Sequence, residues 1–274
     1  PASSDIYKRY DLSLEEYQMY TCDICFVCHG SDVNRHIKKV IDNISGNNSH
    51  KECEMIYEIY KGYENFVKQT GKFFYSREMF YEFIDGSTVG LYNRKLDSKA
   101  LDIITNDMYV QFNQRLYRQV LVDWLLEAGF GNIKLWGNGW TDNEKYQPYA
   151  MGPAENGETL SKIYQASKIV IGNNITTTNA ARAWETMLSG GFYLSNYIPE
   201  EEDFSDIRKI VEIGKDVIMF YGKEDLIEKT KYYLEHEDER QIMIERGRKV
   251  ALEKMTFDIL MKRTLSEVAR RLEE

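Results

Sequence analysis

Short apolar runs alternate with amphipathic stretches over the second half of the chain. The apolar runs have the length of strands and lie at residues 133–137, 169–171, 192–194 and 216–220. The stretches with helical periodicity lie at residues 160–167, 180–189, 223–235, 240–252 and 257–272. Short runs that are apolar throughout are typical of parallel strands covered by helices on both faces. This alternation predicts an α/β fold built on a doubly wound parallel sheet.

The first half of the chain is organised differently. Residues 1–20 are expected to be extended, and residues 22–28 are expected to form a strand of the same sheet. The segment that follows reads as almost wholly helical, with breaks around residues 45–49, 70–72 and 85–93. We therefore expect residues 1–35 and 129–274 to form one Rossmann-like domain, and residues 36–128 to form a large helical insertion after the first strand.

Aromatic side chains are concentrated in this insertion. Tyr60, Tyr63 and Val67 keep helical spacing, which predicts that the aromatic residues form a helical core. A surface that meets a partner or an acceptor is the alternative interpretation.

The stretch from Lys168 to Asn196 carries the strongest indication of a binding site. It reads as a buried strand, a polar loop, an amphipathic helix, a Gly190–Gly191 stop and a second strand. Any of three loop residues could cap the helix that starts near Ala180: Thr177, Thr178 and Asn179. A helix N-terminus at the carboxyl end of a parallel strand is a natural anion site.

Helical spacing assigns the faces of this predicted helix. Ala181, Trp184 and Leu188 are expected to face the core, and Arg182 and Glu185 to lie together on another face. A carboxylate one turn into such a helix can accept hydrogen bonds from sugar hydroxyls. The stretch therefore indicates a nucleotide or sugar-phosphate pocket, with a solvated ion pair between Arg182 and Glu185 as the alternative.

Composition narrows the function classes. The 274 residues are 43% hydrophobic and carry a net charge of -9, which argues against a general nucleic-acid binder. No apolar run approaches the ~20 residues of a membrane span, and no signal peptide is apparent. We expect a cytoplasmic protein without a transmembrane segment. Because the sequence opens with Pro1, we also expect it to be part of a longer chain.

The cysteine spacing resembles a metal motif but sits in a predicted strand. Cys22, Cys25 and Cys28 follow a C-x2-C-x2-C pattern. On a strand, Cys22 and Cys28 should point to one face and Cys25 to the other, so the three could not share one metal ion. We therefore expect reduced core cysteines and no metal site.

Several segments together resemble a known enzyme family. The resemblance is to the carboxyl half of CgeB-like (spore-maturation-type) glycosyltransferases, relatives of the group 1 glycosyltransferases with the GT-B fold. It covers residues 131–265 and extends to CDICFVCHGSDVNR, which is similar to the first strand and phosphate loop of the same domain. The segments that carry it are LWGNGW, LSKIYQASKIVIGNN, ARAWETMLSGGFYLSN, DVIMFYGKEDLIEKTKYYLEHEDER and GRKVALEKMTF.

The resemblance implies a glycosyltransferase, or its donor-binding domain, that moves a sugar from a nucleotide-sugar to an acceptor hydroxyl. It assigns Glu185 to the ribose hydroxyls and Arg35 to the diphosphate. Many relatives carry a second glutamate eight positions before Glu185, where this chain has Thr177. The donor is expected to be UDP- or GDP-linked and to act as a substrate, with no resident cofactor. The acceptor is a protein or glycan, faced by an amino-terminal acceptor domain of a longer parent chain.

Further nucleotide-sugar contacts are expected from Gly30, Gly137 and Trp140, and from the amides near Thr178 and Asn179. Each has a structural alternative, as a turn glycine or as a core aromatic residue. No catalytic residue is assigned. Two other functions stay open: a non-catalytic nucleotide-binding regulatory domain, and a protein-interaction module that uses the aromatic helical insertion.

Overall fold

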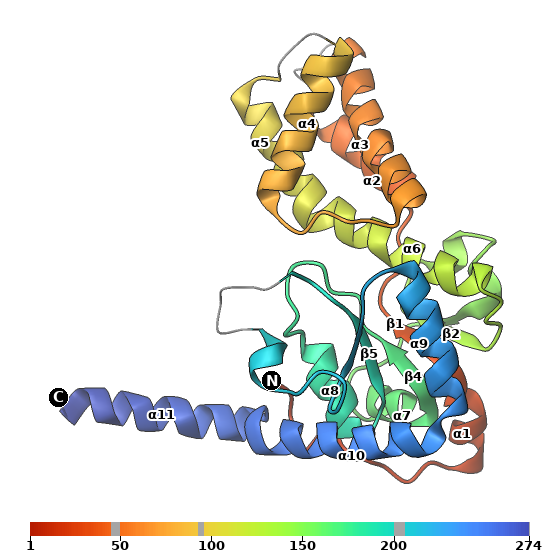
Figure 1. The fold of residues 1–274 in the computed structure, drawn as a ribbon, viewed down its shortest axis with the longest axis vertical. Helices are drawn as coiled ribbons and strands as arrows, with labels where there is room; N and C mark the ends of the chain where they lie inside the picture. The colour runs from red at the N-terminus through yellow and green to blue at the C-terminus, as the bar shows by residue number, and fades with distance from the viewer. Residues whose placement is uncertain (45–49, 93–95, 200–205, 274) are drawn as a thin grey trace.

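A single sheet of six parallel strands organises the molecule (Figure 1). The computed structural model describes residues 1–44, 50–92, 96–199 and 206–273. In the order in which they lie side by side, the strands are β3 (Ala150–Gly152), β2 (Ile133–Trp136), β1 (Cys22–Val27), β4 (Ser167–Ile171), β5 (Tyr193–Asn196) and β6 (Ile218–Phe220). The register places Ile24 of β1 between Ile133 of β2 and Ile169 of β4. The predicted α/β doubly wound parallel sheet is confirmed.

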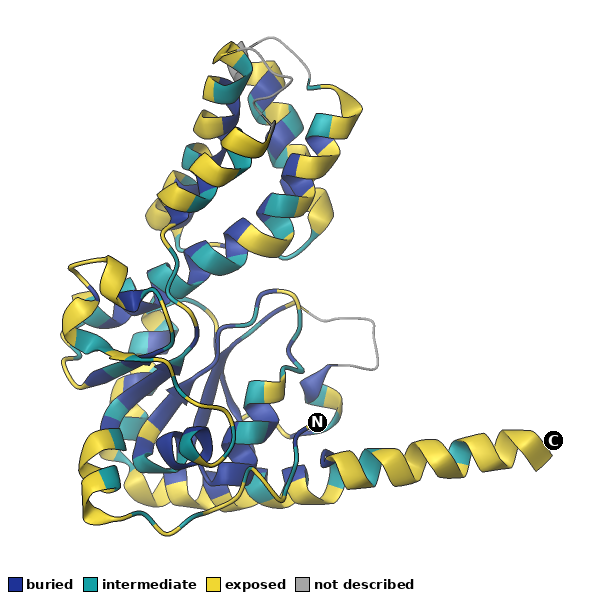
Figure 2. Cartoon of the chain, turned by 180° about the vertical axis from the view of Figure 1, so that it is seen from behind, coloured by how far each residue is buried: buried dark blue, intermediate teal, exposed yellow. Residues whose placement is uncertain are grey.

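Helices cover both faces of the sheet, and each face has its own hydrophobic core. One face, with Ile24 and Phe26, packs against α6 (Asn113–Glu127) and α9 (Lys223–Glu235). The other face, with Cys25 and Val170, packs against α7 (Glu158–Ala166) and α8 (Ala181–Ser189). The last two helices are α10 (Glu237–Lys254) and α11 (Phe257–Glu273), and Figure 2 shows α11 exposed along most of its length.

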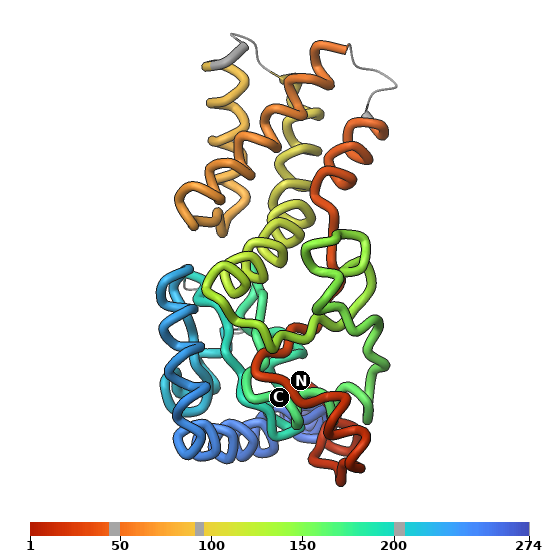
Figure 3. The backbone as a smooth tube through the Cα atoms, turned by 90° about the vertical axis from the view of Figure 1, so that its right-hand side faces the viewer, coloured from red at the N-terminus to blue at the C-terminus, as the bar shows by residue number. Residues whose placement is uncertain are grey.

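The predicted helical insertion lies between β1 and β2. It consists of α2 (Val33–Ile44), α3 (His50–Thr70), α4 (Arg77–Tyr92), α5 (Ser98–Asp107) and a π-helical turn (Met108–Phe112), which continues into α6. Figure 3 shows the chain leaving the sheet after β1, passing through these helices and returning along α6. Tyr60, Tyr63 and Phe80 are fully buried there, so the predicted aromatic core is confirmed for these residues.

Two expectations about the elements are wrong, and one strand was not predicted. Residues 1–20 are not extended throughout, because Ser13 and Glu16 form a capping box that starts α1 (Leu14–Tyr20). The break expected at 85–93 is absent as far as Tyr92, since burial of Ile84 and Thr88 holds α4 together despite its glycines. The short edge strand β3 was not expected. The break predicted at 45–49 lies outside the described residues.

The cysteines are buried as expected, but their directions differ from the prediction. Cys22 lies with Cys25 in the core on one face of the sheet, and Cys28 lies on the other face. Cys22 is the first residue of the strand, so the strict alternation that governs the rest of β1 does not fix its direction. Among the described residues, no helix is long and apolar enough to cross a membrane.

Candidate functional site

The candidate site lies at the carboxyl edge of the sheet, between β1 and β4. From this point β1, β2 and β3 follow in one direction, while β4, β5 and β6 follow in the other. In open α/β sheets, ligands bind outside the carboxyl ends of the strands at such a topological switch point. The loop after β1 and the loop from β4 to α8 face each other here.

The glycines of the β1 and β2 loops are explained by a close approach of the two backbones. A Cβ atom on Gly137 would lie 2.2 Å from the carbonyl oxygen of Cys28, and its φ of +128° also requires glycine. A Cβ atom on Gly30 would lie 2.8 Å from the backbone of Gly139. The amide of Gly30 donates to the carbonyl of Asn138 at 2.8 Å. Gly30 and Gly137 thus lie where two loops meet, and this contact explains both glycines without a ligand; their predicted role as ligand contacts stays a prediction.

Trp140 belongs to the core and is unavailable for stacking on a base. Its side chain is 1% exposed, and its indole Nε1 donates to the carbonyl of Cys28 at 2.7 Å. The ring packs edge-on against Tyr146. The alternative that Trp140 is a core aromatic residue is confirmed, and this burial does not favour its predicted contact with a nucleotide.

The polar loop before α8 does not cap the helix as predicted. The N-cap residue is Ala180, and no side chain caps this end. Thr178 is tied to Asp206 at 3.2 Å, Asn179 accepts from the indole of Trp184 at 2.5 Å, and Thr177 accepts from the amide of Asn179 at 3.2 Å. The threonine and asparagine side chains shape the loop, and the amides of the first turn of α8 are left without a side-chain cap.

The faces of α8 are close to the prediction, with one exception. Trp184 and Leu188 are buried as expected, but Ala181 is exposed and Ala183 takes its place in the core. The predicted stop is confirmed: Gly190 adopts φ +82°, and the amide of Gly191 donates to the carbonyl of Thr186 at 2.9 Å.

Arg182 lies at the switch point, half-buried, and donates from Nη1 to the Oδ1 atom of Asn173 just after β4. Arg182 and Glu185 both belong to the part of the chain that the structure describes, and they do not form an ion pair with each other. Burial raises the pKa of the Glu185 carboxyl, against the attraction of Arg182 and a hydrogen bond from the Tyr7 hydroxyl. Burial, followed by the charge of Glu185, raises the pKa of Tyr7 to about 12. Glu185 is thus a partly desolvated carboxylate without an ion-pair partner among the described residues, whereas the alternative interpretation was a solvated ion pair between Arg182 and Glu185.

Two arginines of α6 extend this positive charge. Arg118 donates from Nη1 to the carbonyl of His29 at 3.3 Å, and Arg115 donates to the hydroxyl of Ser31 at 3.1 Å. Burial, together with the charges of Arg182 and Arg115, lowers the pKa of Arg118. The buried Nε atoms of Arg115 and Arg118 have no hydrogen-bond partner within the described part of the chain.

Arg115, Arg118 and Arg182 form what we call the arginine cluster. Among residues 1–44, 50–92, 96–199 and 206–273, no carboxylate forms an ion pair with any of the three. Like charges held together in a partly desolvated place, with no carboxylate in ion-pair contact, are suited to bind an anion. Sequence reasoning missed Arg115 and Arg118, because they lie at the end of the helical insertion, far along the chain from either loop.

Arg35 does not join the cluster. It lies in the first turn of α2, where its side chain is 59% exposed and its Nη1 atom pairs with the carboxylate of Asp142 at 3.2 Å. The structure therefore gives Arg35 a carboxylate partner of its own, and its predicted contact with the diphosphate stays a prediction.

The family of the chain follows from its sequence. A sequence model of the glycosyl transferase-like family matches residues 114–266, more than half of the chain. The chain belongs to this family, and the match includes Arg115, Arg118, Arg182 and Glu185. A search of curated proteins found no match.

Several solved structures are similar to this chain at low sequence identity. TarM is 11% identical with a TM-score of 0.43, over 54% of this chain and 31% of that one. The pneumococcal O-GlcNAc transferase GtfA, solved with UDP and GlcNAc, is 18% identical with a TM-score of 0.37, over 54% and 33%. A glycosyltransferase from Rickettsia africae ESF-5 is 11% identical with a TM-score of 0.48, over 100% and 56%. The matches span about a third of TarM and of GtfA.

Proposed function

We propose that this chain is the donor-binding domain of a nucleotide-sugar-dependent glycosyltransferase of the CgeB-like, GT-B type. The observation that carries the proposal is the arginine cluster, without carboxylate partners among the described residues, at the switch point of a chain of the glycosyl transferase-like family. The reaction moves a sugar from a UDP- or GDP-linked donor to an acceptor hydroxyl. We propose that an amino-terminal acceptor domain of a longer parent chain faces this edge of the sheet.

The arginine cluster supplies the electrostatic part of the reaction. As the bond from the sugar to the diphosphate breaks, negative charge grows on the leaving oxygen. Guanidinium donors already fixed at that place stabilise this charge without reorganising. Arg118 is held by the carbonyl of His29 and Arg182 by Asn173, so both are oriented before the donor arrives. The uncapped amides at the start of α8 add to this positive field.

Glu185 is proposed to bind the ribose hydroxyls. It lies one turn into α8, its carboxylate accepts from Tyr7, and burial raises its pKa. A partly desolvated carboxylate of this kind forms strong hydrogen bonds to hydroxyl donors. Because guanidinium groups neutralise the diphosphate, this mechanism requires no divalent cation, and nucleotide binding should persist in excess EDTA.

A non-catalytic regulatory domain is the second candidate. Thr177 stands where many relatives have a glutamate, and its hydroxyl is engaged with the amide of Asn179. Such a domain would bind the nucleotide without turning the donor over.

Calorimetry with UDP, GDP and their sugar conjugates tests the proposed function. We expect one site per chain and unchanged affinity in EDTA. Slow hydrolysis of the bound donor would support the enzyme, whereas binding without any turnover by the longer parent chain would favour the regulatory domain. A chain that binds none of these nucleotides would refute the proposal.

A further inference from the structure

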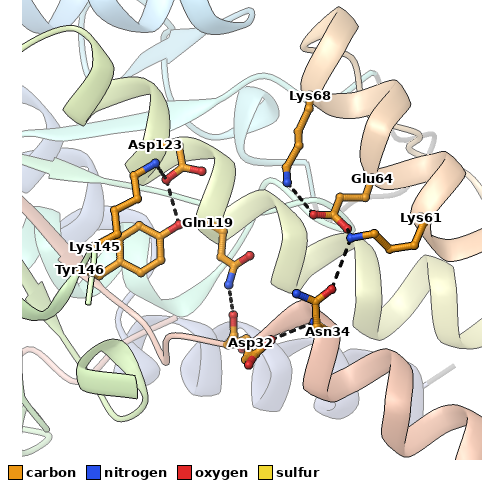
Figure 4. A network of polar contacts seen from close by, with 10 residues as sticks. Asp32, Asn34, Lys61, Glu64, Lys68, Gln119, Asp123, Lys145 and Tyr146 are labelled. Atoms are coloured by element: carbon orange, nitrogen blue, oxygen red, sulfur yellow. Dashed lines mark hydrogen bonds and ion pairs between the residues drawn. The ribbon is translucent and has the colours of Figure 1, made fainter. Parts of the chain in front are cut away.

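A polar hollow of about 320 Å³ opens where the helical insertion meets the sheet domain. Its walls come from α2, α3, α6 and the loop after β2, so both parts of the molecule build it. Figure 4 shows the side chains that converge there, among them Asp32, Asn34, Glu64, Gln119 and Asp123. Ligand pockets start at about 300 Å³, so the hollow has room for a small unit such as one sugar ring.

Two of the carboxylates that line the hollow, Glu64 and Asp123, are already paired with lysines. Glu64 pairs with both Lys61 and Lys68, and the Nζ atom of Lys68 lies 2.6 Å from the Glu64 carboxylate. Asp123 accepts from Lys145 at 2.6 Å and from the hydroxyl of Tyr146 at 2.8 Å. A charged ligand would have to break these pairs, whereas an uncharged ligand can add hydrogen bonds to them.

Donors and acceptors remain available along the wall. Asp32 uses one carboxylate oxygen to accept from the backbone amides of Asn34 and Arg35, at 2.9 and 3.1 Å. Three polar atoms have no hydrogen-bond partner within the described part of the chain: the other oxygen of Asp32, the side-chain nitrogen of Asn34 and the side-chain oxygen of Gln119. A sugar hydroxyl both donates and accepts, so neighbouring hydroxyls match this mixture. The buried side chains of Leu116 and Val120 supply an apolar floor for the ring carbons.

The hollow adjoins the arginine cluster through shared walls. Gln119 donates to the carbonyl of Ser31, and Arg115 donates to its hydroxyl at 3.1 Å. Arg118, one position before Gln119 on α6, donates to the carbonyl of His29 in the same loop. A ligand in the hollow and an anion at the arginine cluster would therefore both contact the loop after β1 and helix α6.

We propose that this hollow binds one sugar unit of a glycan acceptor that the facing acceptor domain also contacts, an inference that rests on the proposed glycosyltransferase function. Most charged groups of the wall are already paired, and the donors and acceptors that remain match the hydroxyls of a sugar. The shared loop places it beside the donor.

The test is a glycan array probed with this chain, with and without saturating UDP or GDP, followed by calorimetry with the best soluble oligosaccharide. The variant Asn34→Trp fills the hollow from an exposed position of α2. The matched control is Asn43→Trp, which is exposed on the same helix nine residues further, on the opposite face. We expect Asn34→Trp to weaken oligosaccharide binding by at least about tenfold, since it removes both space and a hydrogen bond. Asn43→Trp should bind like wild type.

Nucleotide affinity of the same variants separates the two proposals. Unchanged nucleotide binding by Asn34→Trp, with the oligosaccharide lost, supports the acceptor site. A wild-type chain that binds nucleotide but captures no glycan, or an Asn34→Trp variant with unchanged oligosaccharide affinity, overturns the inference and leaves the donor site standing. A wild-type chain that binds no nucleotide refutes the glycosyltransferase function, and with it the acceptor role. Melting temperatures within a few degrees of wild type confirm that both variants fold.

Discussion

Replacing Arg118 by Gln removes one charge from the centre of the arginine cluster. The wild-type guanidinium is partly buried, lies near the charges of Arg182 and Arg115, and has a lowered pKa as a result. Gln keeps a polar side chain of similar length that can still donate a hydrogen bond to the carbonyl of His29. We expect the variant to fold and to bind nucleoside diphosphates more weakly than wild type.

The expected loss follows from the contacts available. A hydrogen bond between a charged donor and a phosphate contributes about 1.5–3 kcal/mol, so Kd should rise by roughly 10- to 150-fold. Stability should respond differently, because the substitution removes repulsion among three like charges. The weaker bond to His29 offsets this gain, and the free energy of unfolding without ligand should change by less than about 1 kcal/mol.

The assay is calorimetric titration with UDP and GDP, paired with chemical denaturation of the ligand-free protein. Arg35→Gln is the matched control, because Arg35 is exposed and paired with Asp142. An exposed pair of this kind contributes about 0–1 kcal/mol, and we expect its loss to leave nucleotide affinity unchanged.

Three outcomes would contradict the reasoning. Equal affinities for wild type and Arg118→Gln would remove the anion role of the cluster. A loss confined to Arg35→Gln would restore the role that the resemblance assigned to Arg35. Unfolding of Arg118→Gln without ligand would show that the arginine is structural.

Three further predictions test neighbouring parts of the structure. Glu185→Gln should weaken nucleoside diphosphate binding by about 1.5–3 kcal/mol in calorimetry. Because burial raises the pKa of Glu185, the folded state favours the protonated carboxyl and gains stability as pH falls. The neutral variant should therefore unfold at a higher urea concentration than wild type near pH 7. Gly137→Ala should lower the free energy of unfolding by at least about 2 kcal/mol, since its Cβ would meet the Cys28 carbonyl. Gly86→Ala in α4 is the control: its Cβ would have nothing within 4 Å, and the free energy of unfolding should rise by about 0.5–1 kcal/mol. Burial alone would raise the pKa of Glu64, but its two lysine partners outweigh burial and hold that pKa below the usual 4.5. The stability that the ionised Glu64 gives the folded state is therefore present above pH 4.5 and is lost as pH falls through the lowered pKa. Glu64→Gln should lower the urea midpoint at pH 7, and the difference from wild type should shrink in acid.

Local sequence patterns predicted the sheet well because its strands are short apolar runs with strong periodicity. The run at 169–171 and the Gly190–Gly191 stop each follow from residues next to one another in sequence, and both are found in the structure. The predicted break at 85–93 failed because packing of Ile84 and Thr88 overrides the low helix propensity of the glycines in α4.

The site was harder to predict because its charges come from distant parts of the chain. Glu185 and Arg182 were recognised from one helix, but Arg118 comes near Arg182 only through the return of α6 to the sheet. The glycines of the loops after β1 and β2 were predicted to be ligand contacts, and their loop contacts could not be predicted for a related reason. Gly30 and Gly137 are explained by contact between two loops more than a hundred residues apart, which no local pattern records.

A crystal structure of this chain with bound UDP or GDP tests the central claim most directly. We expect the diphosphate oxygens within hydrogen-bond distance of the Arg118 and Arg182 guanidinium groups, at the carboxyl ends of β1 and β4, and the ribose hydroxyls on the Glu185 carboxylate. A diphosphate bound away from the arginine cluster, against Arg35 or elsewhere on the surface, would contradict the account.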